Sequence, residues 1–286
     1  MAVYMKLWKK VLIGAVAFVV IFRLGLPVVL HNLGVHPEYT GQTFQVKEKR
    51  ALIITTSHKV LAAPGETEGD ATGVFASEMT HPYYVFSDAG MSVDLASIKG
   101  GAIPVDPQSF AFPIISPEDK RYQQDEIFKA KVKNSIAIKD VDISQYDAVF
   151  ISGGWGAAYD LAQSPELAEK ISEAYYNEKQ TVIGAVCHGL LGLINAKDKQ
   201  GNILISGRKM TGVTDKQIKE LDIEVTPLHP ETELRKAGAL FESKSAFKDF
   251  FATHIVVDDE QRFVTGQNQN SGLEAAHKVT ELLSIR

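Results

Sequence analysis

The feature of this sequence that most constrains its fold is an apolar segment that runs into a Cys-His-Gly corner. Residues 181–186 read Thr-Val-Ile-Gly-Ala-Val, and Cys187, His188 and Gly189 follow directly, ahead of a leucine-rich stretch. The short β-branched run predicts a buried strand, and the stretch after it predicts a helix. A turn of this kind lifts its apex side chain out of the sheet and directs the first helical N–H groups toward it. We therefore predict a reactive thiol at Cys187, partly ionised because the helix N-terminus and the neighbouring imidazole favour negative charge.

A second interpretation of Cys187 is open, because a free cysteine is most often a small buried hydrophobic residue. Gly184 and Gly189 on its two sides, and the adjacent His188, favour the reactive interpretation, since a buried filler needs none of them. Cys187 is also the only cysteine in the chain. This excludes an intrachain disulfide and a cysteine-rich zinc or iron–sulfur site.

Composition bounds the class of protein. The chain has 286 residues, 45% of them hydrophobic, which is enough for one large α/β domain. Its formal net charge is −5, and Lys and Arg do not cluster outside the N-terminus. Nucleic acid is therefore not an expected partner.

Residues 11–30 form an apolar segment that follows Lys6, Lys9 and Lys10 and is interrupted by Arg23. As a helix, these roughly twenty residues span the ~30 Å hydrocarbon core of a bilayer, at a cost of a few kcal/mol for Arg23 unless its side chain reaches the interface. The alternatives are a cleaved signal peptide and a buried core helix. The segment has no convincing small-x-small cleavage site and no amphipathic stripe, so we favour an uncleaved anchor. The positive flank predicts a single-pass membrane protein with a cytoplasmic N-terminus and a periplasmic or extracellular domain.

These features divide the chain into an anchor at 1–31, a polar tether at 32–49 and an α/β domain at 50–286. Within the domain, short apolar runs alternate with longer amphipathic segments, which predicts a mostly parallel sheet sandwiched by helices. Strands are expected at 51–56, 91–96, 147–152 and 181–186, a hairpin at 255–265, and helices at 72–88, 165–177, 230–237 and 271–284. Residues 100–146 are expected to form an irregular cap. The loops after the strands should converge on one site at the carboxyl edge of the sheet.

Several motifs between residues 49 and 286 resemble, in order and with compatible spacing, those of the ThiJ/PfpI superfamily. They are Thr72-Gly-Val-Phe-Ala-Ser-Glu78, His81-Pro82-Tyr83, Asp88-Ala89-Gly90, Asp94-Leu-Ala-Ser97, Gly153-Gly154, Ala185-Val-Cys-His-Gly189 and Val264-Thr-Gly-Gln-Asn268. The chain is most similar to the branch of stress chaperones with glyoxalase III activity. The resemblance implies a flavodoxin-like fold of the class I glutamine amidotransferase type. The N-terminal anchor is not part of the pattern.

The resemblance also implies roles for individual residues. Cys187 is the expected nucleophile, and Glu78 matches a carboxyl group that lies against the thiol, shares a proton with it and has a raised pKa. The N–H groups of Gly154 and His188 match an oxyanion hole, and His188 also moves protons. The plainer alternatives are a surface glutamate and a histidine that only spaces the turn. The implied chemistry needs no metal ion and no organic cofactor.

Two positions depart from the family pattern. Trp155 stands where the branch has a histidine, which adds an apolar wall to the expected substrate pocket. Ile218 occupies the place of the acid that orients the histidine, and Asp215, three residues earlier, is the candidate substitute. Residues 228–231 also copy a His-Pro-Glu motif of glutamine amidotransferases, but too close to the cysteine, and they are more simply the start of a helix.

The leading functional hypothesis is conversion of a small reactive carbonyl such as methylglyoxal to a hydroxy acid through Cys187. One alternative is a redox sensor or holdase chaperone in which Cys187 is oxidised to a sulfinic acid that Glu78 stabilises. A peptidase or amidase is another. Members of the family often dimerise, so a homodimer is one expected assembly.

Overall fold

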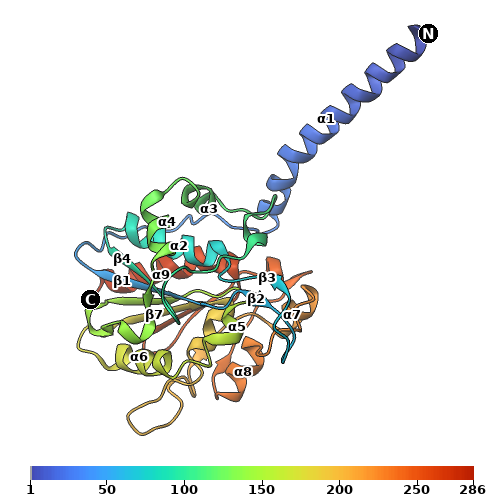
Figure 1. Cartoon of the computed structure of the whole chain (residues 1–286). Coiled ribbons are helices and arrows are strands. Elements are labelled where there is room, and N and C mark those ends of the chain that lie inside the picture. The colour runs from blue at the N-terminus through green and yellow to red at the C-terminus, as the bar shows by residue number, and fades with distance from the viewer. Residues whose placement is uncertain (1) are drawn as a thin grey trace.

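A seven-stranded sheet lies at the centre of the α/β domain in the computed structural model, which describes residues 2–286 and the side chains from Trp8 onward (Figure 1). The strand order is β10-β11-β7-β6-β1-β4-β5, and every neighbouring pair is parallel except β10 and β11. The strands are β1 Arg50–Thr55, β4 Ser92–Ser97, β5 Ile136–Ala137, β6 Ala148–Ile151, β7 Val182–Val186, β10 Ile255–Val257 and β11 Phe263–Gly266. The predicted mostly parallel sheet and the C-terminal hairpin are confirmed.

Both faces of the sheet are buried, as the alternating side chains of β1 illustrate. Ala51 and Ile53 pack into one apolar cluster, and Leu52 and Ile54 pack into another. Helices α2 and α9 cover the first face, whereas α6 and α8 lie on the other side of the sheet (Figure 1). Near-continuous apolar strands are the expected consequence, because a parallel sheet covered on both sides has no solvent face.

The helices and the short strand pairs outside the sheet complete the chain. The helices are α1 Ala2–Asn32, α2 Ala76–Asp88, α3 Pro117–Tyr122, α4 Glu126–Lys133, α5 Ala157–Asp160, α6 Pro165–Tyr176, α7 Asp215–Glu220, α8 Pro230–Lys236 and α9 Gly272–Ser284. The two-stranded pairs are β2 Val60–Leu61 with β3 Asp70–Ala71, and β8 Lys209–Met210 with β9 Leu240–Phe241. Residues 100–146 contain short helices and β5, in line with the predicted irregular segment.

The first helix of the domain begins four residues later than predicted. Asp70 and Ala71 pair with β2, and Val74 forms a bridge with Val105, so the backbone is extended where a helix was expected from Thr72. These are contacts with distant segments, which local periodicity does not register. The later start places Glu78 in the first turn of α2.

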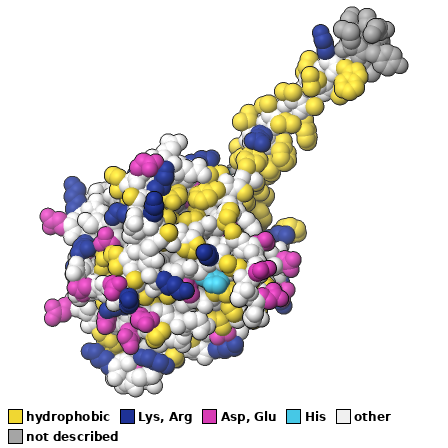
Figure 2. Space-filling view, in the orientation of Figure 1, with side chains coloured by type: hydrophobic (Ala, Val, Ile, Leu, Met, Phe, Trp, Pro, Cys, Tyr) yellow, Lys and Arg dark blue, Asp and Glu magenta, His cyan; other side chains and the backbone are white. Residues whose placement is uncertain are grey.

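Helix α1 projects away from the domain, and most of its apolar side chains from Trp8 onward are exposed (Figure 1, Figure 2). Residues Trp8–Asn32 are the one helix among the described residues that is long and apolar enough to cross a membrane. Lys6, one of the predicted flanking charges, has its side chain outside the described residues. Near the domain, the Arg23 guanidinium lies 5.4 Å from the centre of the Phe112 ring.

The segment after α1 is docked on the domain. Val35 and Val46 are buried, and the backbone N–H of Val46 donates to the Ala89 carbonyl at 2.8 Å. The His36 backbone N–H donates to Asn270 Oδ1 at 2.8 Å, and its ring nitrogen Nε2 lies 2.5 Å from the Ile114 carbonyl oxygen. The predicted tether is therefore attached to the domain at several points.

Candidate active site

The predicted turn at Cys187 is present, in a strained conformation. Val186 ends β7 in an extended conformation, and Cys187 follows with φ = 56°, in the left-handed region that costs a non-glycine residue about 1–2 kcal/mol. The segment after it is a 3₁₀ helix, Cys187–Gly192, and not the longer helix that the leucines predicted. The thiol is thereby held at the carboxyl edge of the sheet, between β7 and this short helix.

Glu78 faces this thiol from the first turn of α2. Its side chain is 1% exposed, and its carboxylate oxygen Oε2 accepts a 2.9 Å hydrogen bond from the Gly153 backbone N–H. The Ser152 hydroxyl donates to the Glu78 backbone carbonyl at 2.9 Å, which fixes the turn of the helix. A Cβ atom at Gly153 would lie 2.6 Å from Glu78 Oε2 and 2.7 Å from the His188 backbone nitrogen, so the close approach of the loop after strand β6 to this carboxyl requires glycine.

Burial raises the pKa of both Glu78 and Cys187. Removal from water raises the pKa of Glu78 to about 8, against smaller opposing effects of its hydrogen bonds with Cys187 and Gly153. Burial and the neighbouring Glu78 also raise the pKa of the Cys187 thiol, although the N–H groups of His188 and Gly154 oppose this. The raised carboxyl pKa agrees with the sequence analysis. The helix N-terminus and the imidazole were expected to leave the thiol partly ionised, but burial and the neighbouring Glu78 outweigh them and raise its pKa. A negative charge on the sulfur therefore depends on Glu78 holding the proton.

Two backbone N–H groups are directed at the sulfur. Those of Gly154 and His188 both favour the charged form of Cys187 and oppose the rise in its pKa. Gly154 has φ = 96°, a conformation that brings its N–H to the thiol and that favours glycine. The structure thus brings together, beside the Cys187 sulfur, the two amides that the sequence analysis paired.

His188 lies next to the thiol, but no hydrogen bond orients the far side of its ring. Its ring nitrogen Nδ1 is 3.4 Å from Cys187 Sγ, whereas its buried Nε2 has no hydrogen-bond partner. Burial, together with the nearby imidazole of His229, lowers the pKa of His188 to about 3. His188 is therefore a neutral imidazole across the physiological range and a weak base.

Asp215 does not orient His188 in this structure. Its carboxylate oxygen Oδ2 accepts a 2.8 Å hydrogen bond from the Thr232 hydroxyl of α8, and its Oδ1 has no partner. Asp215 is the first residue of α7, and its backbone N–H donates to Glu231. The hydrogen bond expected from the sequence is absent because the carboxyl turns toward α8. Ile218, at the position of the missing acid, is buried.

A cavity of about 220 Å³ lies over the thiol. Cys187, Glu78, His188 and Gly154 line its floor, and Trp155 forms part of the wall, as expected from the sequence. The remaining lining residues are mostly apolar: Phe75, Ile114, Val213, Leu221, Ile223 and Phe250, with Gln108, Gln217 and Gln269. The site is thus a small pocket with a polar floor and apolar walls.

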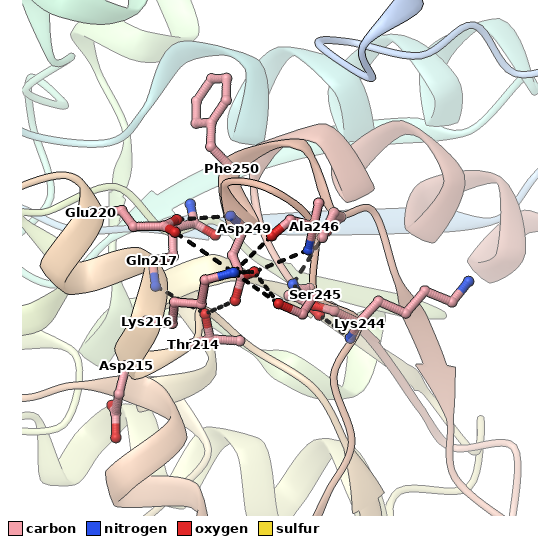
Figure 3. Close-up of polar contacts among 12 residues, drawn as sticks. Thr214, Asp215, Lys216, Gln217, Glu220, Lys244, Ser245, Ala246, Asp249 and Phe250 are labelled. Carbon is pink, nitrogen blue, oxygen red and sulfur yellow. Dashed lines mark hydrogen bonds and ion pairs between the residues drawn. The ribbon is translucent and has the colours of Figure 1, made fainter.

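A buried carboxylate fixes one wall of this pocket. Asp249 accepts hydrogen bonds from the Thr214 hydroxyl at 2.7 Å and the Lys216 ammonium at 2.8 Å, and its backbone N–H donates to Glu220 (Figure 3). Figure 3 also shows that Asp215 points away from this network. Because Gln217 is part of α7 and Phe250 adjoins Asp249, the network holds two lining side chains in place.

Several lining residues were missed by the sequence analysis. Phe250 and Leu221 carry no motif, and only the fold places them near the thiol. Gln269 immediately follows a motif that the family resemblance had marked, so its position next to the site had a signal, although no role was assigned. Among the described residues there is no group of three or more His, Cys, Asp or Glu side chains that could hold a metal ion.

Comparison with known proteins identifies the family. The profile of the DJ-1/PfpI family matches residues 71–282, and the chain belongs to this family. "Glyoxalase 3" of Candida albicans is 33% identical over 224 residues, which cover 74% of this chain and 90% of that protein. A probable glutathione-independent glyoxalase of Schizosaccharomyces pombe is 28% identical over 257 residues, covering 77% of this chain and 94% of the relative.

Solved structures agree with this assignment. The crystal structure of glyoxalase III from Candida albicans matches with a TM-score of 0.70 and 30% identity, over 81% of this chain and 95% of that one. The Rapid Encystment Protein of 24 kDa from Francisella tularensis matches with a TM-score of 0.73 and 33% identity, over 82% of this chain and 99% of that one. The flavodoxin-like fold is therefore shown by both the sheet topology and the structural neighbours.

Proposed function

We propose that this protein is an enzyme of the glyoxalase III type, which converts a 2-oxoaldehyde and water to a 2-hydroxy acid with Cys187 as nucleophile. The observation that carries the proposal is the buried Glu78–Cys187 pair beneath a small cavity. The names of the relatives, glyoxalases that act without glutathione, support the same reaction class. In that class the protein's own thiol would take the place of glutathione.

The first step is addition of sulfur to the aldehyde. With the shared proton on Glu78, the Cys187 thiolate forms a bond to the aldehyde carbon, and the carbonyl π electrons move to the oxygen. The N–H groups of Gly154 and His188 stabilise the resulting oxyanion. Protonation of that oxygen gives a hemithioacetal.

The second stage moves hydrogen within the substrate. A base removes the proton from C1, and the electron pair forms a C1–C2 double bond while the C2 carbonyl oxygen takes up a proton. C2 then takes up a proton and the C1 hydroxyl loses its own, which gives a 2-hydroxy thioester. C1 is oxidised and C2 reduced by the same two electrons, so no external oxidant is needed. Water then adds to the thioester at C1, the C–S bond breaks, and the 2-hydroxy acid leaves with Cys187 regenerated. Glu78 and His188 are the groups at hand for these transfers, and the low pKa of His188 leaves Glu78 the larger share.

The size of the pocket favours a small carbonyl over a peptide. A peptidase must hold an extended chain across its nucleophile, whereas the cavity over Cys187 has about 220 Å³, below the ~300–1,000 Å³ typical of pockets for drug-sized ligands. The redox-sensor alternative shares the same thiol. Multiple turnovers distinguish the two functions, because the thiol of a sensor is used up by its oxidant, whereas an enzyme regenerates its thiol after each reaction.

The test is consumption of methylglyoxal by the purified full chain, with Cys187→Ala as the matched variant. We expect wild type to release the hydroxy acid over many turnovers and the variant to lose at least 10³-fold in kcat/KM, since the nucleophile is removed. Equal rates would refute the proposal. If peroxide gives a stable oxygen adduct on Cys187 while no dicarbonyl is consumed, the sensor alternative replaces it.

We also propose that α1 anchors the domain to a membrane, with the domain on the outer side. Residues 8–22 form roughly 22 Å of helix, so in a span of ~30 Å that begins at Trp8 the backbone of Arg23 lies about 8 Å from the far interface, a distance that its long side chain can largely bridge. Phe112, which is 45% exposed and lies against Arg23, would then touch the interfacial region. Reaching the interface lowers the cost of an arginine in the membrane-spanning segment.

Topology is tested by labelling. Cys187 is buried, so a Phe247→Cys substitution in a Cys187→Ala background provides a reporter at a side chain that is 93% exposed. An impermeant thiol reagent should label it on intact cells. Labelling that requires lysis would reverse the orientation, and recovery of the chain in the soluble fraction would refute the anchor.

A further inference from the structure

The apolar walls of the pocket have no part in the chemistry proposed for its floor. Trp155 packs against the apolar core while facing the cavity, and Leu221, Ile223 and Phe250 line the cavity from other segments. Methylglyoxal carries a single methyl group, which cannot cover walls of this extent. An apolar wall over a polar floor is typical of a site that recognises an apolar substituent.

We infer that the pocket selects 2-oxoaldehydes whose substituent is an aliphatic chain or an aromatic ring larger than methyl, held against Trp155. This inference rests on the proposed function and adds the substrate class. Addition at the aldehyde carbon occurs on the floor of the pocket, as described above, and the substituent on C2 extends toward the apolar wall.

The volume of the cavity agrees with this substrate class. Its 220 Å³ corresponds to roughly seven water-sized groups at ~30 Å³ each. Methylglyoxal has five non-hydrogen atoms, and bonded carbons each occupy less space than a water molecule. The cavity therefore has room for several further carbon atoms, but not for a peptide.

Two unpaired amide groups give the dicarbonyl its orientation. Gln217 Oε1 and Gln269 Nε2 are buried without a hydrogen-bond partner, and both side chains line the cavity. Buried polar groups normally have partners, so unpaired ones in a pocket point to a ligand that supplies them. A Gln269 N–H can donate to the C2 carbonyl oxygen, and Gln217 Oε1 can accept from the hydroxyl that forms there. Every 2-oxoaldehyde can make both contacts, so they do not distinguish one substituent from another. Selection among substituents therefore depends on the apolar wall.

The pocket also lies beside the point where α1 leaves the domain. The Ile114 carbonyl, on a residue of the pocket rim, contacts the His36 ring. Asn270 accepts from the His36 backbone N–H and donates to the Phe250 carbonyl at 2.7 Å. If α1 is in a bilayer, the rim is close to the membrane surface, where carbonyl compounds with apolar substituents concentrate.

The experiment compares kcat/KM of the full chain in detergent for methylglyoxal, a 2-oxoaldehyde with a butyl substituent, and phenylglyoxal. Each buried CH₂ group can contribute up to about fourfold. We expect kcat/KM for the butyl and phenyl compounds to exceed that for methylglyoxal at least tenfold. Trp155→His should lower the ratio of butyl to methyl at least fivefold, and Leu221→Asn, at a more exposed position of the wall, should lower it in the same direction.

Phe247→His is the matched control, since it makes the same kind of change at an exposed aromatic residue outside the pocket and should leave the ratio unchanged. Gln269→Leu should lower kcat/KM for all three compounds by a similar factor. Equal or better use of methylglyoxal by wild type would overturn the inference while the proposed function stands. A ratio that both wall variants leave unchanged would also overturn it. Consumption of none of the compounds would refute the proposed function itself.

Discussion

The two sides of the Cys187 thiol are built differently. On one side, the Glu78 carboxyl is buried, hydrogen-bonded to Gly153 and placed by the first turn of a helix in the core. On the other side, the His188 imidazole contacts the sulfur, its Nε2 has no hydrogen-bond partner, and burial and the nearby His229 lower its pKa. Burial raises the pKa of the Glu78 carboxyl and lowers the pKa of the His188 imidazole. The comparison indicates that proton control at this thiol comes from the carboxyl side, unlike a triad in which an acid orients the histidine.

The largest expected effect comes from removing the carboxyl. Glu78→Gln keeps the size of the side chain but cannot take up or release a proton, so no carboxyl remains to accept the proton of the Cys187 thiol. We expect kcat/KM for a consumed 2-oxoaldehyde to fall about 10⁴-fold, the upper end of general acid–base effects. Steady-state kinetics measure it, with the melting temperature as a check on folding. A loss smaller than that of His188→Asn would reverse the comparison.

Stability should depend on pH through the same carboxyl. Folding raises the pKa of Glu78 from 4.5 to about 8, so the native state binds a proton that the unfolded state has released. Its contribution is complete below about pH 4.5 and is lost as the pH rises through about 8, on the order of 5 kcal/mol at ~1.4 kcal/mol per pKa unit.

Urea unfolding of wild type and Glu78→Gln across this range measures the difference. The wild type should lose stability relative to the variant as the pH rises, since the variant has no proton to lose. Parallel curves for the two proteins would show that Glu78 ionises normally.

A smaller effect is expected on the imidazole side. His188→Asn removes a neutral, weakly basic ring while keeping the backbone N–H that faces the sulfur, so kcat/KM should fall about 10- to 100-fold. The pH–rate profile should retain its decline above about pH 8, because that decline reports Glu78. A profile that loses this decline would assign it to His188 instead.

The smallest effect is expected at Asp215. Asp215→Asn keeps an acceptor for the Thr232 hydroxyl and removes only the charge, so kcat/KM should stay within about threefold of wild type. A loss as large as that of His188→Asn would mean that Asp215 does orient the histidine during turnover.

Local patterns predicted the sheet and the thiol, and the family resemblance added Glu78 and the two amides, but neither predicted the start of α2 or the direction of the Asp215 carboxyl. The β-branched run before Cys187 and the glycines on both sides of it were sufficient for the strand and the turn, since both are short-range features. The start of α2 was misplaced because Val74 pairs with Val105, a contact across thirty residues of sequence. Asp215 was assigned from its distance to a family position, and only the packing of α7 on α8 turns its carboxyl away.

The sequence by itself determined a parallel α/β sheet, a turn that presents Cys187, and an apolar helix long enough to span a bilayer. Each follows from composition and spacing within a few residues. Only the tertiary structure decided where the proton resides. Burial under α2 and β6 raises the pKa of Glu78 and lowers that of His188, because charge is costly away from water. Desolvation depends on every segment that encloses the site, from Phe75 to Gln269, and no local stretch of sequence contains that information.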